Sequence, residues 1–492
     1  MFTRILMAIA AVFVLAGVAG PAEARWLRAE SQKFIVYSDG DEMTLRQFVS
    51  NLEDYDRILR QELRVPQDRD TSRKLEIYLV GRREALQVVR PGLPESIAGF
   101  YSASMYDIFA IAHRPQRGDA YADDVIYHEY AHHFMLHYLP RSYPGWYIEG
   151  FAEYYAPIEL KDTTFIVGGV NQGRAHSLLN EKWIPMEDLL NKRPFEFKTA
   201  DERSAYYAQA WLLTHYMNAD PARKQQLIRY VAALGPGEKS SDVWTEVTGD
   251  SMATLTNKLQ AYKKGNIVAT GWKRVEKRRT AEMTIAPLPA SADGMLLLRQ
   301  RLMGPVSESE EASLLAEVRS QAARYPGDRL AELVLAQAEF KYGDFAKGRS
   351  LIDGLLAKDA ADADALRIIG VALVDQAWKD PANDEKLFKE GRKFLARAYQ
   401  ADNDDYRTMV YFTLTQQGDP DYPDDNTLNV LAEAFVRAPQ VADVRLMLAR
   451  GLMRNKRWDE ATALLTPLTN DPHGGGAAST AQGLLRQIAA NR

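Results

Sequence analysis

The sequence His-Glu-Tyr-Ala-His occupies residues 128–132, and Trp-Tyr-Ile-Glu-Gly-Phe-Ala-Glu-Tyr follows at residues 146–154. On a helix, residues four apart lie one turn above each other on the same face, so His128 and His132 can direct two imidazole rings at one point. We expect this helix over residues 120–138, followed by a second helix that carries the other segment. The pair of segments predicts a metal site between two consecutive helices.

A catalytic zinc ion usually takes three protein ligands and keeps its fourth position for water, so two histidines need a third partner. Glu149, in the second segment, is the best candidate. Glu129, beside the first histidine, is placed to take a proton from the water instead of binding the ion. We therefore expect one Zn²⁺ per chain, held by His128, His132 and Glu149.

The alternative interpretation is a helix that is merely rich in histidine. His133 and His137 also lie four apart in this segment. They point about a hundred degrees away from the first pair and have no Glu in the corresponding position, so we expect packing or supporting roles for them. With eight histidines in 492 residues, chance gives a His-Glu-x-x-His match in roughly one per cent of such chains. A metal site is the better explanation.

Glu153 lies one helical turn after Glu149. It could hydrogen-bond the second ring nitrogen of a liganding histidine and fix the tautomer of that ring. A solvated surface charge is an equal alternative. Asp119 is expected to cap the first helix and Pro140 to end it.

The segment around Glu149 resembles the Asn-Glu-Gly-Phe-Ala segment of the gluzincin metallopeptidases, the superfamily of thermolysin and aminopeptidase N. In that family the Glu before the Gly is the third zinc ligand. The resemblance implies an α+β domain with a small N-terminal mixed sheet and a helical lobe. It also implies a transition-state tyrosine, for which Tyr207 is the matching position and Tyr206 the second choice. The Gly-x-Met-Glu-Asn segment by which aminopeptidases hold a free amino terminus is missing.

The nearest likeness is to peptidase-MA-like bacterial proteins that couple such a domain to helical repeats. In gluzincins the edge of the sheet binds the substrate backbone by strand addition. By resemblance, residues 106–112 would occupy that edge. A packed interior strand is an equally good interpretation of this apolar stretch.

Composition sets further bounds. A chain of 492 residues predicts two or three domains. An apolar content of 46%, a charged content of 26% and a net charge of −5 are ordinary for a globular protein and argue against a nucleic-acid partner. The sequence has no cysteine, which excludes disulfides and attachment through a lipidated cysteine.

Residues 1–24 have the features of a targeting segment: a basic start, an apolar run, and Ala-Glu-Ala as a cleavage site. We therefore expect an exported protein, periplasmic or secreted, with the metallopeptidase domain over residues 25–275. An uncleaved anchor is the alternative, but the run is shorter than the roughly twenty residues of a spanning helix. No stable membrane span is expected after cleavage.

The last part of the chain has a different pattern. A basic and then Pro-rich stretch predicts an exposed linker over residues 276–292, with its basic side chains solvated or touching an anionic surface. Residues 345–348 and 458–461 occupy matching places in the tetratricopeptide (TPR) pattern of about 34 residues. We expect an all-α TPR-like solenoid over residues 293–492, with a protein partner on its surface or a structural lid as its role.

Two functions of different classes follow. The first is an exported zinc metallopeptidase that acts on a polypeptide substrate, with Glu129 as general base and Tyr207 as a second catalytic residue. The alternative is a TPR-based assembly or scaffold protein whose peptidase-like domain is an inactive binding module. A hydrolase of a non-peptide amide would use the same residues.

Overall fold

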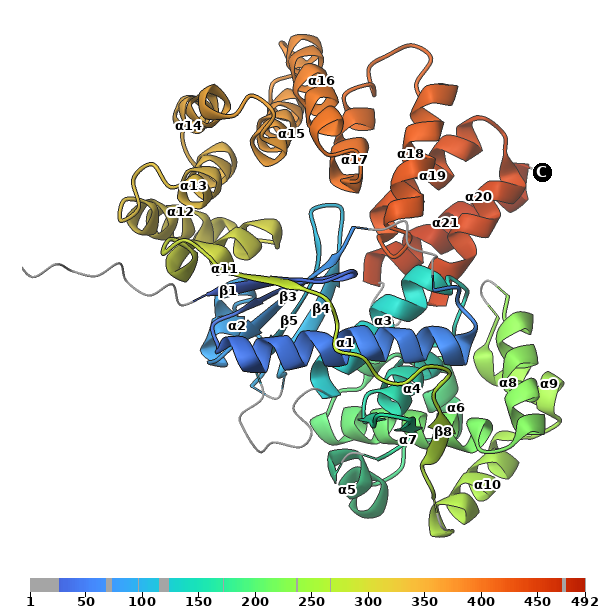
Figure 1. The fold of residues 1–492 in the computed structure, drawn as a ribbon. Helices are drawn as coiled ribbons and strands as arrows, with labels where there is room; N and C mark the ends of the chain where they lie inside the picture. Colours follow the sequence, from blue (N-terminus) through green and yellow to red (C-terminus); the bar gives the residue numbers. More distant parts are fainter. Residues whose placement is uncertain are drawn as a thin grey trace, which may run out of the picture.

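The computed structural model describes residues 26–67, 73–95, 97–114, 124–170, 172–235, 238–265, 267–470 and 475–491. The predicted targeting segment, residues 1–24, and the predicted cap Asp119 lie outside these ranges. Within them the chain is a mixed α+β half followed by a mostly helical half (Figure 1). A search of the described helices for one long and apolar enough to cross a membrane finds none.

A six-stranded sheet organises the first half, in the order β4-β5-β3-β2-β1-β9. Its inner pairs, β2 with β3 and β3 with β5, are parallel, and the outer pairs are antiparallel. The sheet is therefore mixed, as expected. Its strands are β1 (Leu27–Glu30), β2 (Phe34–Ser38), β3 (Leu75–Val80), β4 (Gly99–Ala103), β5 (Ile108–His113) and β9 (Thr284–Pro287).

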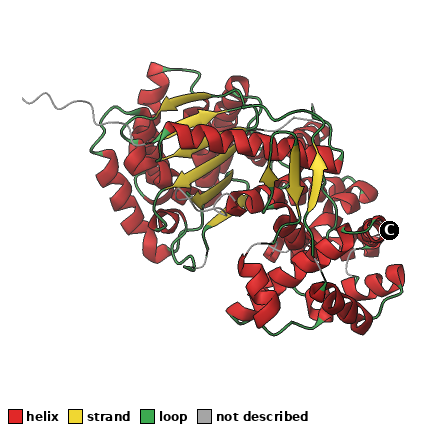
Figure 2. Cartoon of the chain, turned by 60° about the horizontal axis from the view of Figure 1, so that its bottom comes forward, coloured by secondary structure: helices red, strands yellow, loops and turns green. Residues whose placement is uncertain are grey.

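The sheet is covered on both faces, which explains why β3 is buried along its whole length and mostly apolar, with Glu76 as its charged residue. Ile77 and Leu79 face a core shared with α1 (Glu42–Leu63), the long helix that crosses the sheet in Figures 1 and 2. Tyr78 and Val80 face the opposite core, formed with α2 (Glu84–Val89) and α11 (Ala292–Met303). Successive residues of one strand thus enter two different cores.

The strand of residues 106–112 is not at the edge of the sheet. A tight turn, in which the Ser104 N–H donates to the Asp107 carbonyl at 3.0 Å, folds the chain back so that β4 covers β5. Of the two interpretations of this stretch, the packed interior strand is therefore correct. The edge strand is β4.

Two helices follow the sheet, α3 (Asp124–Tyr138) and α4 (Gly145–Tyr155), and α3 ends before Pro140 as expected. A helical lobe and a small three-stranded sheet pack behind them and share their core. The lobe contains α5 (Gln172–Asn180), α6 (Met186–Asn191), η1 (Pro194–Glu196), α7 (Ala200–Asn218), α8 (Pro221–Ala233), α9 (Ser240–Thr248) and α10 (Met252–Lys264); the sheet contains β6 (Glu159–Leu160), β7 (Thr164–Val167) and β8 (Thr270–Lys273).

The stretch predicted as an exposed linker, residues 276–292, is built into the fold. It carries β9, which pairs with β1. Just before it, Arg274 forms a two-pronged ion pair with Asp54 of α1, at 2.6 and 2.8 Å, and both side chains are almost completely buried. Polar and Pro-rich composition resembles that of a linker, but a buried carboxylate on α1 and an open strand edge hold this segment in place.

The second half is a stack of helix pairs that arches over one end of the sheet (Figure 1). Helices α13 and α14, α15 and α16, α17 and α18, and α19 and α20 pack as pairs. Small residues recur where helices touch: a Cβ added at Gly391 would lie 3.3 Å from the Gly370 carbonyl oxygen. After α11 come α12 (Glu308–Ala322), α13 (Arg329–Tyr342), α14 (Phe345–Lys358), α15 (Ala363–Lys379), α16 (Asp384–Ala401), α17 (Tyr406–Leu414), α18 (Asp425–Arg437), α19 (Ala442–Arg454), α20 (Trp458–Leu465), η2 (Thr466–Asn470) and α21 (Gly475–Asn491).

Candidate metal centre

Three side chains from α3 and α4 converge on one point. The Nε2 atoms of His128 and His132 lie 3.1 Å apart, and Oε2 of Glu149 lies 3.5 Å from each of them. His132 and Glu149 are buried, whereas His128 keeps 18% of its side chain exposed, so solvent reaches the site from that side. Among the described residues, this trio is the group of possible ligands that could share a metal ion.

The spacing of these atoms fits a zinc ion. Zinc bonds of about 2.0–2.2 Å to nitrogen and oxygen in a tetrahedron place neighbouring ligand atoms about 3.3–3.5 Å apart. Two edges of the observed triangle, at 3.5 Å, have that length, and the third, at 3.1 Å, is slightly shorter. Two imidazoles and one carboxylate are also the donor set of a catalytic site, which leaves a fourth position for water.

The charge around His128 favours a cation. Burial alone would lower the pKa of His128, but a hydrogen bond with Glu149 and the charges of Glu153 and Glu129 outweigh it and raise that pKa. Three carboxylates thus surround one imidazole. A divalent ion held by the triangle would balance this negative charge.

Glu129 points toward the edge of the sheet and not into the triangle. Its Oε2 accepts a hydrogen bond of 3.0 Å from the backbone N–H of Tyr101 on β4. Glu129 is not one of the three residues whose ligand atoms converge, and its role as a base stays a prediction. The contact from Tyr101 was not predicted, because no sequence pattern links an edge strand to a helix 28 residues away.

Glu153 is buried, so the solvated surface charge considered for it is wrong. Its Oε1 lies 3.5 Å from Nδ1 of His128 and 2.5 Å from a guanidinium nitrogen of Arg174 on α5. Glu153 therefore connects a ring of the triangle to an arginine. Sequence reasoning missed Arg174, which lies 21 residues further on in another helix and matches no motif.

Tyr207 lies beside this group. The Arg174 guanidinium carbon is 4.8 Å from the centre of its ring. The charge of Glu149 and, next, burial raise the pKa of Tyr207. Tyr206, the second choice, is fully buried and donates its hydroxyl to the Lys192 carbonyl at 3.2 Å, so it is directed elsewhere.

Gly150 explains how α7 reaches the site. A Cβ at this position would lie 2.5 Å from the Ala210 carbonyl oxygen of α7, so only glycine allows α4 and α7 to touch. This contact sets Tyr207 of α7 beside Glu149 of α4.

The remaining histidines of interest lie off the triangle. Nδ1 of His133 lies 3.0 Å from the Tyr101 hydroxyl, and Nδ1 of His137 lies 3.0 Å from Oε1 of Gln440 in the helical half. His215 pairs with the Tyr262 hydroxyl at 2.8 Å. The first two have the supporting positions expected for them.

Comparison with known proteins gives little. No protein-family model matches this sequence, and no curated protein matches it. Among solved structures, a thermophilic TPR protein from Thermus thermophilus superposes on 41% of this chain and 98% of its own, with 16% identity and a TM-score of 0.32. A likeness at that level does not establish a shared fold, and it does not bear on the metal centre.

Proposed function

We propose that the chain is an exported zinc-dependent metallopeptidase of the gluzincin type, with one zinc ion bound by His128, His132 and Glu149. The observation that supports this proposal is the triangle of ligand atoms, whose edges of 3.1 to 3.5 Å suit tetrahedral zinc. Such an ion, when bound, polarises a carbonyl and lowers the pKa of water toward neutrality.

Other side chains of the site transfer the proton, bind the oxyanion and orient a ligand. Glu129 accepts a proton from the attacking water and delivers it to the leaving amine. One of its oxygens accepts the Tyr101 N–H, which leaves the other for this transfer. Tyr207 donates its hydroxyl to the oxyanion that develops on the substrate. Glu153, held by Arg174, orients the ring of His128 through Nδ1.

The test separates metal binding from turnover. Glu129→Gln is expected to retain zinc, by elemental analysis, and to lose cleavage of an unfolded protein substrate. His132→Ala is expected to lose both. The matched control is Glu187→Gln, at an exposed position of α6, which should match the wild type. An unaltered cleavage rate in Glu129→Gln, or cleavage that persists with a chelator, would refute the proposal.

A second candidate is the scaffold alternative, and the groove between α16 and α18 favours it. This groove has a volume of about 450 Å³ and is lined by residues that include Tyr399, Phe412 and Asn429. A chain that binds zinc and captures unfolded protein without cleaving it, or that binds no zinc, would support this function over the first.

A further inference from the structure

The turn between β4 and β5 inserts into the inner side of the helical arch. The Tyr406 hydroxyl of α17 donates to the Ser104 carbonyl at 2.6 Å. Asp107, at the other end of the turn, forms an ion pair of 3.1 Å with Arg407, and both side chains are buried. The turn is therefore held at both ends by the first two residues of one helix.

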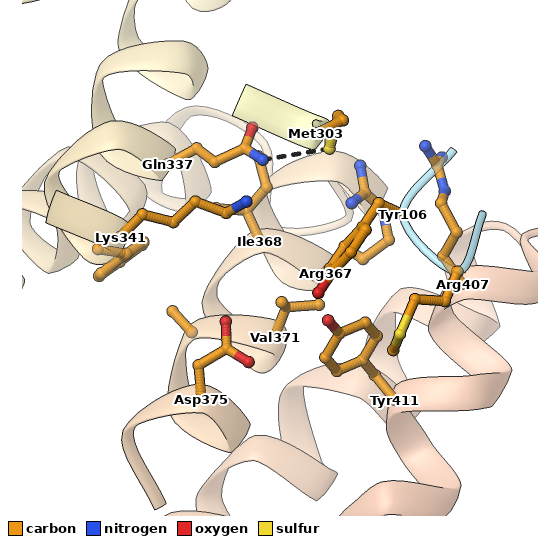
Figure 3. Close-up of a pocket in the computed structure, with 13 residues that line it drawn as sticks. Tyr106, Met303, Gln337, Lys341, Arg367, Ile368, Val371, Asp375, Arg407 and Tyr411 are labelled. Carbon is orange, nitrogen blue, oxygen red and sulfur yellow. Dashed lines mark hydrogen bonds between the residues drawn. The ribbon is translucent and has the colours of Figure 1, made fainter. Parts of the chain in front are cut away.

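The tip of the turn also contacts the arch. Tyr106, which stays partly exposed, projects between α13, α15 and α17 beside a small cavity of about 40 Å³, where its ring lies near that of Tyr411 (Figure 3). Ala103, Met105 and Ile108 add apolar contacts with the core that α17 shares with its neighbours. Part of the inner face of the arch, around α13, α15 and α17, is therefore occupied by a hairpin of the same chain.

A second anchor lies closer to the metal centre, at the corner between α18 and α19. An amide oxygen can only accept, so His137 donates Nδ1–H to Oε1 of Gln440 at 3.0 Å. The His137 ring stacks on the ring of His133, with the two centroids 5.5 Å apart. Nδ1 of His133 in turn lies 3.0 Å from the Tyr101 hydroxyl. Gln440, His137, His133 and Tyr101 thus form one continuous series of contacts.

Tyr101 connects this series of contacts to the site. Its hydroxyl meets the His133 ring, while its backbone N–H donates to Oε2 of Glu129. The residue lies on β4, which has a single strand neighbour and so depends on other contacts for its position. The helical half supplies such contacts directly at the turn, and indirectly from Gln440 through His137 and His133.

We propose that Gln440 is a positioning residue: through His137 and His133, the C-terminal helical half holds Tyr101 and so orients the carboxylate of Glu129. The inference rests on the proposed function for its catalytic consequence, because it assigns Glu129 as the base. Its structural content is separate: the Tyr101 backbone is ordered by a residue more than 300 positions away in the sequence.

The structural content is tested by hydrogen exchange on the full chain. In Gln440→Ala, the peptide covering residues 99–103 is expected to exchange about tenfold faster, because the hydrogen bond that fixes His137, and with it the His133 ring behind Tyr101, is lost. The matched control is Gln400→Ala, an exposed glutamine on α16, which should leave that peptide unchanged. Equal exchange in Gln440→Ala and the control would overturn the inference, whether or not the protein cleaves peptides.

The catalytic content is tested by kinetics at constant zinc content. A misplaced base affects the transition state more than substrate binding, so Gln440→Ala should lower kcat about tenfold or more and change KM less than twofold. Tyr101→Phe keeps the backbone N–H but removes the hydroxyl. If both residues act through one chain of contacts, the double variant loses no more than the more affected single variant. Losses that multiply, or a raised KM with an unchanged kcat, would overturn the inference and leave the metallopeptidase proposal intact.

Discussion

The contact at Gly150 gives a prediction whose sign opposes helix propensity. In an open helix position, Gly→Ala stabilises by up to about 1 kcal/mol. At Gly150 the added Cβ would lie 2.5 Å from the Ala210 carbonyl oxygen, whereas ordinary contacts begin near 3.4 Å. Helices α4 and α7 must therefore separate by about 1 Å. Overpacking of this kind costs about 1–3 kcal/mol, so we expect Gly150→Ala to destabilise by about 2 kcal/mol.

The assay compares two alanine variants by denaturant unfolding. Gly354 lies in α14 with nothing within 4 Å of an added Cβ, so Gly354→Ala should stabilise the protein. Gly150→Ala should destabilise it and should also lower kcat about a hundredfold, because a shift of 1 Å moves Tyr207 away from Glu149. Gly150→Ala that is as stable as Gly354→Ala would refute the reasoning about this contact.

Two further predictions concern buried charge. Arg174→Ala should weaken zinc affinity about 10–100-fold, since Glu153 loses the partner that orients it. Arg229→Ala, at an exposed site of α8, should leave zinc affinity unchanged. Competition with a chelator measures both affinities, and equal affinities in the two variants would contradict the prediction. Burial alone would raise the pKa of Glu76, but Arg299 and other arginines lower it from 4.5 to about 2. A carboxyl group whose pKa is lower in the folded than in the unfolded state stabilises the folded protein at pH values above its unfolded-state pKa. The free energy of unfolding should therefore decrease as the pH falls from about 4.5 to about 2. Glu76→Gln should flatten this fall, and an unchanged pH profile would contradict the assignment.

The sequence predicts those parts of the candidate site that depend on local geometry. His128 and His132 are brought together by one turn of α3, and the Glu149 segment follows closely enough to form the next helix. Arg174 and Gln440 could not be predicted, because each meets the site only after helices distant in sequence have packed. Their contacts are set by tertiary structure, which periodicity and motif spacing do not reveal.

The fold shows the same division between features set by local sequence and features set by long-range packing. Amphipathic α1 and the mostly apolar β3 follow from their own residues. The interior position of β5 depends on which strand pairs beside it, and the fate of residues 276–292 depends on a buried carboxylate, Asp54, more than 200 residues earlier. Composition predicted the exposure of that stretch, whereas its pairing with β1 is set by tertiary contacts.

The pairing of β1 with β9 has a consequence for biogenesis. The partner of the first described strand is synthesised about 250 residues later, so during translation β1 presents an open edge to other chains. Contacts between such distant parts of a sequence form slowly. A fragment cut at residue 275 would keep that edge permanently open, so we expect the first half to aggregate when it is expressed alone.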